Sequence, residues 1–361
     1  MDSKAEKEAP KGKTAGKPIR CRAAVARKAG EPLVIEEQFP GCFPRILGHE
    51  AFGIVESVGE DVEDFKEGDS VVPIFLPDCT ECLDCKSKKS NLCTKFPFRA
   101  SPLLHRDETS RFTDLKGEAL HHFLFVSSFS EYTVIDIANL TKIDPSIPPN
   151  RACLLSCGVS TGVGAAIRSA NVEPGSTVAI FGLGSIGLAV AEGARLCGAA
   201  RIIGVDINPD KFERGKTFGV SDFVNSLTIG DKSVSQVICE MTGGGADYCF
   251  ECVGQATLVQ EAYASCRKAW GKTVVLGVDQ PGKQVSLSSF EVLHSGKTLT
   301  GSLFGGLKPK SDIPVLAKRY TDGELQLDKF VTHEVGFEDI NKAFDLLIQG
   351  KSLRCVIWMD K

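Results

Sequence analysis

The alternation of short apolar runs with helical segments between residues 159 and 303 constrains this fold more than any other feature. The apolar runs are uninterrupted, which is typical of strands buried on both faces. Strands that alternate with helices at this spacing predict a doubly wound parallel sheet, and therefore an α/β fold. The predicted strands are Thr177–Phe181, Arg201–Asp206, Ala246–Cys252 and Lys272–Gly277, and the predicted helices are Ile186–Cys197, Pro209–Phe218 and Leu258–Arg267.

A glycine-rich loop joins the first of these strands to the first helix. In this setting the GxGxxG pattern indicates a dinucleotide site, because the free N–H groups at a helix start bind phosphate. Gly182 allows the tight turn, Gly184 lets the backbone approach a pyrophosphate, and Gly187 lets helix and strand pack closely. The alternative is a glycine-rich turn in a domain that binds no dinucleotide. The loop residues are Gly182, Leu183, Gly184, Ser185, Ile186 and Gly187.

An acidic residue ends the next predicted strand. Asp206 stands where a carboxylate can accept hydrogen bonds from the ribose hydroxyls of adenosine. The same carboxylate would repel a 2′-phosphate, and Ile207 and Asn208 follow it with no arginine to accommodate one. The sequence therefore predicts NAD, rather than NADP, as the cofactor.

A cluster of four cysteines forms the second strong motif. Four thiolates this close in sequence can complete a tetrahedral zinc shell, and no position is then left open for water. The cluster therefore predicts a structural zinc site rather than a catalytic one. An iron–sulfur cluster is the rival interpretation, and four unrelated thiols are the third. The cysteines are Cys79, Cys82, Cys85 and Cys93.

Composition excludes several classes of protein. The chain has 361 residues, a net charge of −4 and a pI near 6.0, which disfavours a nucleic-acid-binding protein. No stretch reaches the length of uninterrupted apolar sequence that a membrane span needs, and the first residues contain no apolar signal segment. We therefore expect a cytoplasmic protein whose residues 1–18 form a disordered, lysine-rich tail.

The part before residue 159 has a different pattern. Between residues 45 and 75 short apolar runs alternate with glycines, as in a β-barrel or a twisted sheet with tight turns. Residues 78–122 are polar and irregular, and Phe123–Val134 is predicted to be a strand.

Two further motifs carry a family resemblance. The pattern Gly48-His49-Glu50-x2-Gly53-x5-Gly59-x2-Val62, the segment Cys153–Gly162, the four-cysteine loop and the glycine-rich loop occur in one order. Together they resemble the zinc-containing alcohol dehydrogenases of the medium-chain superfamily, and the plant alcohol dehydrogenase-like proteins in particular. The resemblance covers about Cys21 to Trp358. It implies a Rossmann domain at 159–303, inserted in a GroES-like β-barrel catalytic domain made of 19–158 and 304–361.

The resemblance also assigns roles to single residues. It implies that His49 and Cys157 bind a catalytic zinc, with the Glu50 carboxylate near the metal. It places Thr161 and Phe304 at the nicotinamide ring and implies a homodimer through an edge strand near Thr298–Phe304. The remaining implied cofactor contacts are Lys211 at the adenosine ribose, Arg354 at the pyrophosphate, and Leu276, Gly277 and Val278 along the nicotinamide.

One departure from the family pattern bears on catalysis. Only Gln38–Cys42 separates the predicted strand Pro32–Glu37 from Phe43. The resemblance implies that roughly 30 residues are absent here, and with them a cysteine that is one of the three protein ligands of a catalytic zinc. The proton relay and some barrel strands would be lost too, which leaves the barrel incomplete. Cys42 could replace the ligand, or Glu50 could complete a His–Cys–Glu shell.

These motifs favour a zinc-dependent alcohol dehydrogenase that transfers hydride between NAD and a primary or secondary alcohol. Zinc would act as a Lewis acid on the alcohol oxygen, and the nicotinamide would carry the hydride. One alternative is a catalytically impaired isoform that binds NAD and structural zinc and dimerises. Another is a glutathione-dependent formaldehyde dehydrogenase of the same family. The partners expected are a small alcohol or aldehyde and a second copy of the chain.

Overall fold

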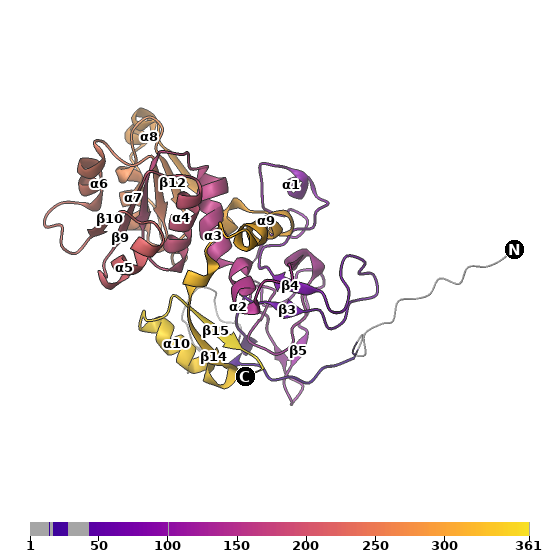
Figure 1. Cartoon of the computed structure of the whole chain (residues 1–361). Coiled ribbons are helices and arrows are strands. Elements are labelled where there is room, and N and C mark those ends of the chain that lie inside the picture. Colours follow the sequence, from indigo (N-terminus) through magenta and orange to yellow (C-terminus); the bar gives the residue numbers. More distant parts are fainter. Residues whose placement is uncertain (1–13, 15–16, 28–42, 100, 361) are drawn as a thin grey trace.

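The computed structural model describes residues 14, 17–27, 43–99 and 101–360. They form two lobes (Figure 1). We call residues 159–303 the nucleotide lobe, and the described parts of 19–158 and 304–361 the catalytic lobe. The expected tail at 1–18 lies almost wholly outside the described residues, as do Cys42 and the position of the expected deletion.

The nucleotide lobe is built on a six-stranded parallel sheet. Its strand order is β10-β9-β8-β11-β12-β13. The chain adds β9 and β10 on one side of β8 and then crosses to the other side to add β11, β12 and β13. This is the doubly wound order in which ligands bind at the carboxyl ends of the strands. The strands are β8 (Thr177–Phe181), β9 (Arg201–Asp206), β10 (Asp222–Asn225), β11 (Tyr248–Glu251), β12 (Lys272–Val275) and β13 (Thr298–Gly301).

Helices cover both faces of this sheet, and the predicted parallel α/β fold is confirmed. The strand predicted at Arg201–Asp206 has the bounds observed for β9. The helices α6 and α8 and the strand β10 were not predicted. The strand was missed because it is a short edge strand with polar residues at both ends. The helices are α4 (Ser185–Leu196), α5 (Asp210–Thr217), α6 (Val234–Thr242), α7 (Ala256–Ser265) and α8 (Ser289–Ser295).

The strands of the catalytic lobe are short. In the described residues they form four small sheets, β1-β2, β3-β4-β7, β5-β6 and β14-β15, and no closed barrel. The expectation of an incomplete barrel agrees with this arrangement. The strands are β1 (Val25–Ala26), β2 (Arg45–Ile46), β3 (Gly53–Ile54), β4 (Ser70–Pro73), β5 (Phe112–Thr113), β6 (Ala119–Leu120), β7 (Leu140–Lys142), β14 (Val331–Gly336) and β15 (Arg354–Trp358).

The strand predicted over Phe123–Val134 is wrong. Leu124, Phe125 and Ser127 have positive φ angles of 50°, 62° and 52°, which no β-strand contains. The Ser127 hydroxyl accepts a hydrogen bond from the backbone N–H of Phe123 at 2.8 Å, and this closes a turn. A buried turn has the apolar composition of a strand, so composition alone misassigns it.

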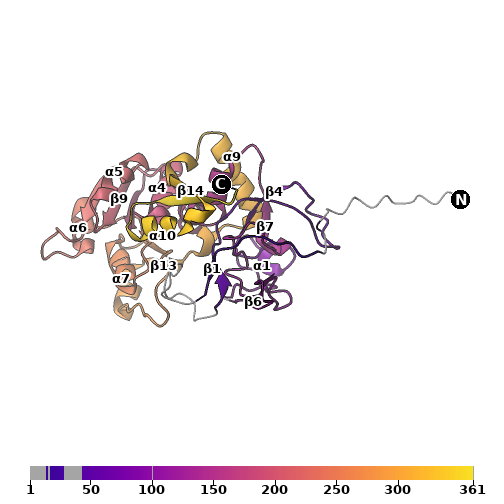
Figure 2. The same cartoon turned by 90° about the horizontal axis from the view of Figure 1, so that it is seen from below.

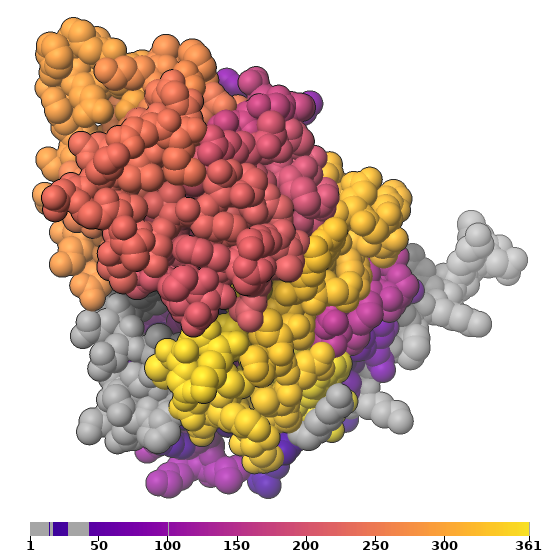
Figure 3. Space-filling view, turned by 60° about the vertical axis from the view of Figure 1, so that its left-hand side comes forward, coloured from indigo at the N-terminus to yellow at the C-terminus, as the bar shows by residue number. Residues whose placement is uncertain are grey.

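The C-terminal segment returns to the N-terminal part of the catalytic lobe (Figures 2 and 3). The Arg22 guanidinium donates to carboxylates of Glu131 and Glu338 at 2.6 and 2.7 Å and to the Met359 carbonyl at 3.1 Å. Residues at both ends of the sequence therefore build one lobe. The helices of this lobe and of the junction are α1 (Leu83–Lys86), α2 (Pro149–Ala152), α3 (Gly158–Gly164), α9 (Pro309–Thr321) and α10 (Ile340–Ile348).

Among the described residues no single helix is long and apolar enough to cross a membrane. One pair bent by 56°, Pro149–Ser156 with Gly158–Ala170, meets the criterion by length and composition only. Core residues of this pair, such as Val159, Val163 and Ala166, are buried in the same cluster as residues of α4.

Candidate active site

The glycine-rich loop has the geometry that its sequence predicts. Gly182 follows β8 with a φ of +94°, and Gly184 is the N-cap residue of α4. A Cβ atom on Gly187 would collide with the carbonyl oxygen of Gly182, whereas one on Gly184 would meet no described atom within 4 Å. Gly187 thus permits helix and strand to pack closely, and Gly184 presents backbone to open space.

Asp206 ties the end of β9 to this loop. One carboxylate oxygen accepts from the Leu183 N–H at 2.8 Å and from the Lys211 ammonium at 2.9 Å, and the other accepts from the Asn208 N–H at 3.0 Å. Its side chain is only 4% exposed. Asp206 and Lys211, which the sequence analysis places at the adenosine ribose, are therefore in direct contact.

Arg354, the first residue of β15, connects the loop to the catalytic lobe. Its guanidinium donates to the Ser185 hydroxyl at 2.6 Å and to the Glu50 carboxylate at 3.2 Å. Glu50 also accepts from the Gly158 N–H at 3.1 Å. A cation thus lies between the start of α4 and the neighbourhood of His49.

Three of the predicted metal ligands meet at this point. Ligand atoms of His49, Glu50 and Cys157 lie within 4.8 Å of one another, and His49 Nε2 is 3.3 Å from Cys157 Sγ. Burial lowers the pKa of His49 and raises the pKa of the Cys157 thiol. An imidazole, a thiolate and a carboxylate are all donors that zinc accepts, and three of them leave one position open. The donor set therefore fits a catalytic zinc.

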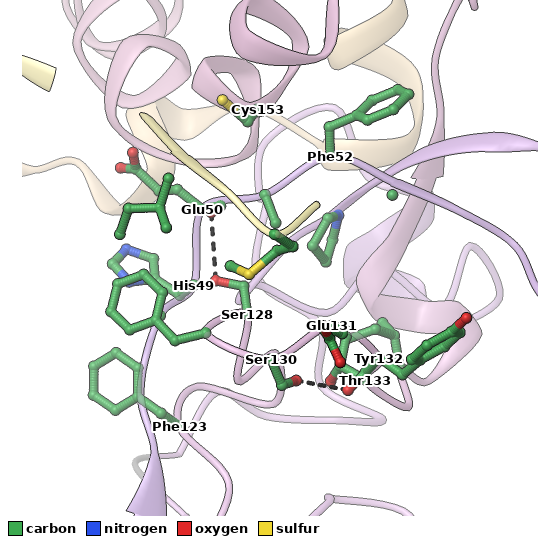
Figure 4. A pocket seen from close by; sticks show the side chains of 18 of the residues that line it. His49, Glu50, Phe52, Phe123, Ser128, Ser130, Glu131, Tyr132, Thr133 and Cys153 are labelled. Atoms are coloured by element: carbon green, nitrogen blue, oxygen red, sulfur yellow. Dashed lines mark hydrogen bonds between the residues drawn. The ribbon is translucent and has the colours of Figure 1, made fainter. Parts of the chain in front are cut away.

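The local fold supplies these ligands from two segments, and Figure 4 shows the side chains of His49 and Glu50. His49 and Glu50 follow β2 after Gly48, whose φ is +87°. The Ser128 hydroxyl donates to the Glu50 carbonyl at 3.4 Å. Cys157 directly precedes α3, and the Thr161 hydroxyl forms a hydrogen bond with its sulfur, which lowers the thiol pKa against the larger effect of burial.

Aromatic rings surround His49, and the sequence analysis did not identify them. The ring centroid of Phe123 lies 5.8 Å from that of His49, and the ring centroid of Phe75 lies 6.1 Å away. Phe75 in turn contacts Phe304 edge to face at 5.7 Å. Phe304, which the sequence predicts at the nicotinamide, is buried. The only sequence signal for Phe75 is its position shortly before the four-cysteine loop.

A cavity of about 2010 Å³ opens beside this centre, and His49, Glu50, Phe123 and Arg354 are among its lining residues. Pockets for small ligands usually measure about 300–1,000 Å³. The cavity therefore extends well beyond the space that a small alcohol fills.

The residues predicted along the nicotinamide directly follow the carboxyl end of β12, beside Glu251 at the end of β11. The N–H groups of Leu276 and Gly277 donate to the Glu251 carbonyl at 2.9 and 3.1 Å. A Cβ atom on Gly277 would approach a Glu251 carboxylate oxygen to 2.6 Å. Val278 is 63% exposed beside them. Glu251 was not predicted, although a carboxylate at the end of a parallel strand is itself a signal for a site.

The four-cysteine loop converges as predicted. All four ligand atoms lie within 4.8 Å of one another. Backbone N–H groups of Cys82, Cys85 and Phe96 donate to the sulfurs of Cys79, Cys82 and Cys93 at 3.3, 3.4 and 3.3 Å. A hydrogen bond from Thr94 and others from the backbone lower the pKa of Cys82 to about 5. Donors aimed at the sulfurs favour thiolates, so the loop fits a structural zinc ion.

Comparison with known proteins agrees with this geometry. Residues 24–145 match the family model described as alcohol dehydrogenase GroES-like domain, and residues 185–321 match that described as zinc-binding dehydrogenase. Alcohol dehydrogenase-like 7 of Arabidopsis thaliana is 65% identical over 379 residues, covering 96% of this chain and 97% of the relative. The chain belongs to the zinc-type medium-chain alcohol dehydrogenase family.

Other alcohol dehydrogenases of the family are similar along most of their length. Alcohol dehydrogenase 1 of Petunia hybrida is 46% identical over 96% of this chain and 99% of its own. The solved structure of benzyl alcohol dehydrogenase from Acinetobacter calcoaceticus is 29% identical with a TM-score of 0.79, covering 94% of this chain and 91% of that one. The predicted family, fold class, enzyme class and zinc and NAD cofactors are thereby confirmed.

The alignment with alcohol dehydrogenase-like 7 spans 379 residues, more than the 361 residues of this chain. That relative consequently contains positions without a counterpart here. The predicted location of the gap, before Phe43, falls outside the described residues.

Proposed function

We propose that this alcohol dehydrogenase family member oxidises primary or secondary alcohols with NAD at a zinc ion held by His49, Glu50 and Cys157. The convergence of these three donors within 4.8 Å carries the proposal. Arg354 links the same centre to the dinucleotide loop by hydrogen bonds to Glu50 and Ser185. Metal and cofactor would therefore be adjacent.

The chain's own residues would prepare the site for the reaction. Zinc, when bound, supplies a Lewis acid for the alcohol oxygen, and NAD supplies the hydride acceptor. The rings of Phe75 and Phe123 pack edge to face against His49 and help to fix the orientation of its imidazole. Thr161 donates to the Cys157 sulfur and so favours its thiolate.

The nucleotide lobe would bind and orient the cofactor. The free N–H groups at the start of α4 and the Arg354 guanidinium favour a diphosphate near Ser185. Asp206 is buried and would accept from ribose hydroxyls, which selects NAD over NADP. Lys211 would contact the same ribose. Gly277 and Val278 would line the nicotinamide.

A zinc determination with a matched pair of variants tests the proposal. We expect two zinc ions per chain by elemental mass spectrometry, one of which is lost in His49→Ala. The variant should keep NADH binding and lose alcohol oxidation, because the dinucleotide loop is untouched. Cys82→Ser should instead lose the other zinc ion. One zinc ion per chain, unaffected by His49→Ala, would contradict the proposal.

The second candidate function is an impaired isoform that binds NAD and structural zinc. One observation favours it. Arg354 and the Gly158 N–H both donate hydrogen bonds to the Glu50 carboxylate, and these bonds compete with a metal ion for the same oxygen. The large cavity beside His49 agrees with a catalytic lobe shorter than that of the relatives. This candidate predicts NADH binding with one zinc ion and no turnover.

We also propose that the chain forms a homodimer in the cytoplasm. The edge of the parallel sheet at β13 is free of a further described strand, and Leu299 is 38% exposed there. Phe290 and Leu293 of the neighbouring α8 are 71% and 77% exposed, an apolar surface that a second copy would cover. Light scattering should give twice the mass of the chain. The described cysteines are free, as in a reducing compartment.

A further inference from the structure

Three cysteines outside both metal-ligand groups meet in the nucleotide lobe. Cys239 lies on α6, Cys249 on β11, and Cys266 directly after α7. Cys249 and Cys266 are 0% and 1% exposed, and Cys239 is half-buried. The proposed hydride transfer uses none of them.

Cys249 and Cys266 belong to the same buried cluster of the nucleotide lobe. The register of β11 against β12 places Cys249 opposite Thr273. The Thr273 hydroxyl lies 3.1 Å from Cys266 Sγ, and the Cys249 thiol forms a hydrogen bond with the same sulfur. Cys266 thus lies across two adjacent strands with two hydrogen-bond donors facing its sulfur.

A small cavity of about 400 Å³ borders Cys266. Cys239 and Cys266 line it together with the charged side chains of Arg267, Lys268 and Lys297. Lys297 is 3% exposed, and its ammonium donates to the Tyr263 carbonyl at 2.8 Å. The cavity is thus positively charged, with two thiols at its wall.

The two thiols are not equivalent. The hydrogen bond from Cys249, with contributions from Thr273 and the Lys297 charge, lowers the pKa of Cys266, whereas burial raises the pKa of Cys249. A thiolate beside cations is the reactive form of cysteine. Cys266 therefore has the environment of an attacking sulfur, and Cys249 that of a resolving thiol.

We propose that Cys266 and Cys249 form an oxidisable thiol pair that a hydroperoxide entering through this cavity converts to a disulfide. The Cys266 sulfur attacks the peroxide, the O–O bond breaks, and an S–O bond forms as water or an alcohol leaves with a proton. The Cys249 sulfur then attacks the sulfenic acid, the S–O bond breaks, and water leaves with the Cys249 proton. One peroxide is reduced and two thiols are oxidised.

Peroxide treatment of the zinc-loaded full chain tests the pair. After alkylation of the remaining thiols and digestion, we expect one cross-linked peptide that joins Cys249 to Cys266 and lacks two hydrogen atoms. Dithiothreitol should reverse it, and zinc per chain should be unchanged while it forms. Absence of this cross-link, or loss of zinc before it forms, would overturn the proposal.

Variants separate the two roles. In Cys249→Ala, oxidation should stop at a Cys266 sulfenic acid, which a dimedone probe captures. If that variant does not fold, the same probe applied briefly to the parent chain should label Cys266 first. Cys197→Ala, which removes a half-buried thiol of the same lobe, should behave as the parent chain. Equal labelling of Cys197 and Cys266 in the parent chain would contradict the assignment.

Discussion

The nucleotide lobe and the catalytic lobe are stabilised in different ways. Between Thr177 and Gly301 six strands form one continuous parallel sheet, whereas the described strands of the catalytic lobe form four separate small sheets. Instead of a long sheet, the catalytic lobe has a four-cysteine loop and ion pairs such as those of Arg22, which connect distant segments. The nucleotide lobe is therefore stabilised mainly by the pairing of adjacent strands. The catalytic lobe is stabilised by contacts between segments far apart in the sequence and by bound metal.

The largest difference between the lobes should follow loss of the structural zinc. Cys93→Ser removes a buried ligand, and loss of a bound metal is among the few changes that cost more than about 4 kcal/mol. We expect calorimetry to show a lower melting temperature for the catalytic lobe and an unchanged transition for the nucleotide lobe. Cys21→Ser, at an exposed thiol, is the control. A single unfolding transition whose melting temperature is lowered as a whole would show that the two lobes do not unfold independently.

Acid should affect the lobes unequally as well. Burial lowers the pKa of His122, in the catalytic lobe, to about 4. Between an unfolded pKa of about 6.5 and this value, the unfolded chain binds a proton that the folded chain does not, so stability falls as pH falls. Below that pH range, the loss of folding free energy caused by this group reaches about 3 kcal/mol.

The His122→Gln variant should flatten the stability profile between these pH values, measured by urea unfolding. His294→Gln, at an exposed histidine of the nucleotide lobe, provides the control. An unaltered profile in His122→Gln would show that His122 is not the group that titrates.

The close packing of the nucleotide lobe can be tested at its glycines. Gly187→Ala places a methyl group against the Gly182 carbonyl, and overpacking of this kind costs about 1–3 kcal/mol. We expect both a lower melting temperature and weaker NADH binding by fluorescence. In Gly184→Ala the added Cβ would meet no described atom within 4 Å, so only NADH binding should weaken. Equal melting temperatures for the two variants would refute the packing argument.

The connection between the two lobes can be tested at Arg354. Arg354→Ala removes the guanidinium that we propose binds the diphosphate beside Ser185, and hydrogen bonds of a charged group contribute about 1.5–3 kcal/mol. We expect NADH to bind roughly 10- to 100-fold more weakly by titration. Arg168→Ala, at an exposed arginine, provides the control. If Arg354→Ala bound NADH as tightly as the parent chain, the diphosphate would have to bind away from Arg354.

The same contrast explains how much the sequence could predict. Gly182, Asp206 and the four cysteines were identified because their partners are neighbours in sequence or follow a strand–loop–helix pattern. Phe75, Phe123 and Glu251 were not, because their positions become meaningful only when distant segments pack together. Cys157 and Arg354 were assigned by resemblance alone. The turn at Leu124–Ser127 was misassigned because apolar composition does not distinguish it from a strand.

The return of the chain's end to its beginning also has a consequence during synthesis. Arg22 and Phe129 find partners in Glu338 and Phe344 only after the whole nucleotide lobe has been translated. At the usual speed of a ribosome this delay is on the order of ten seconds. The first half of the catalytic lobe must pass that interval with its apolar surface uncovered, so chaperones should engage this part of the nascent chain.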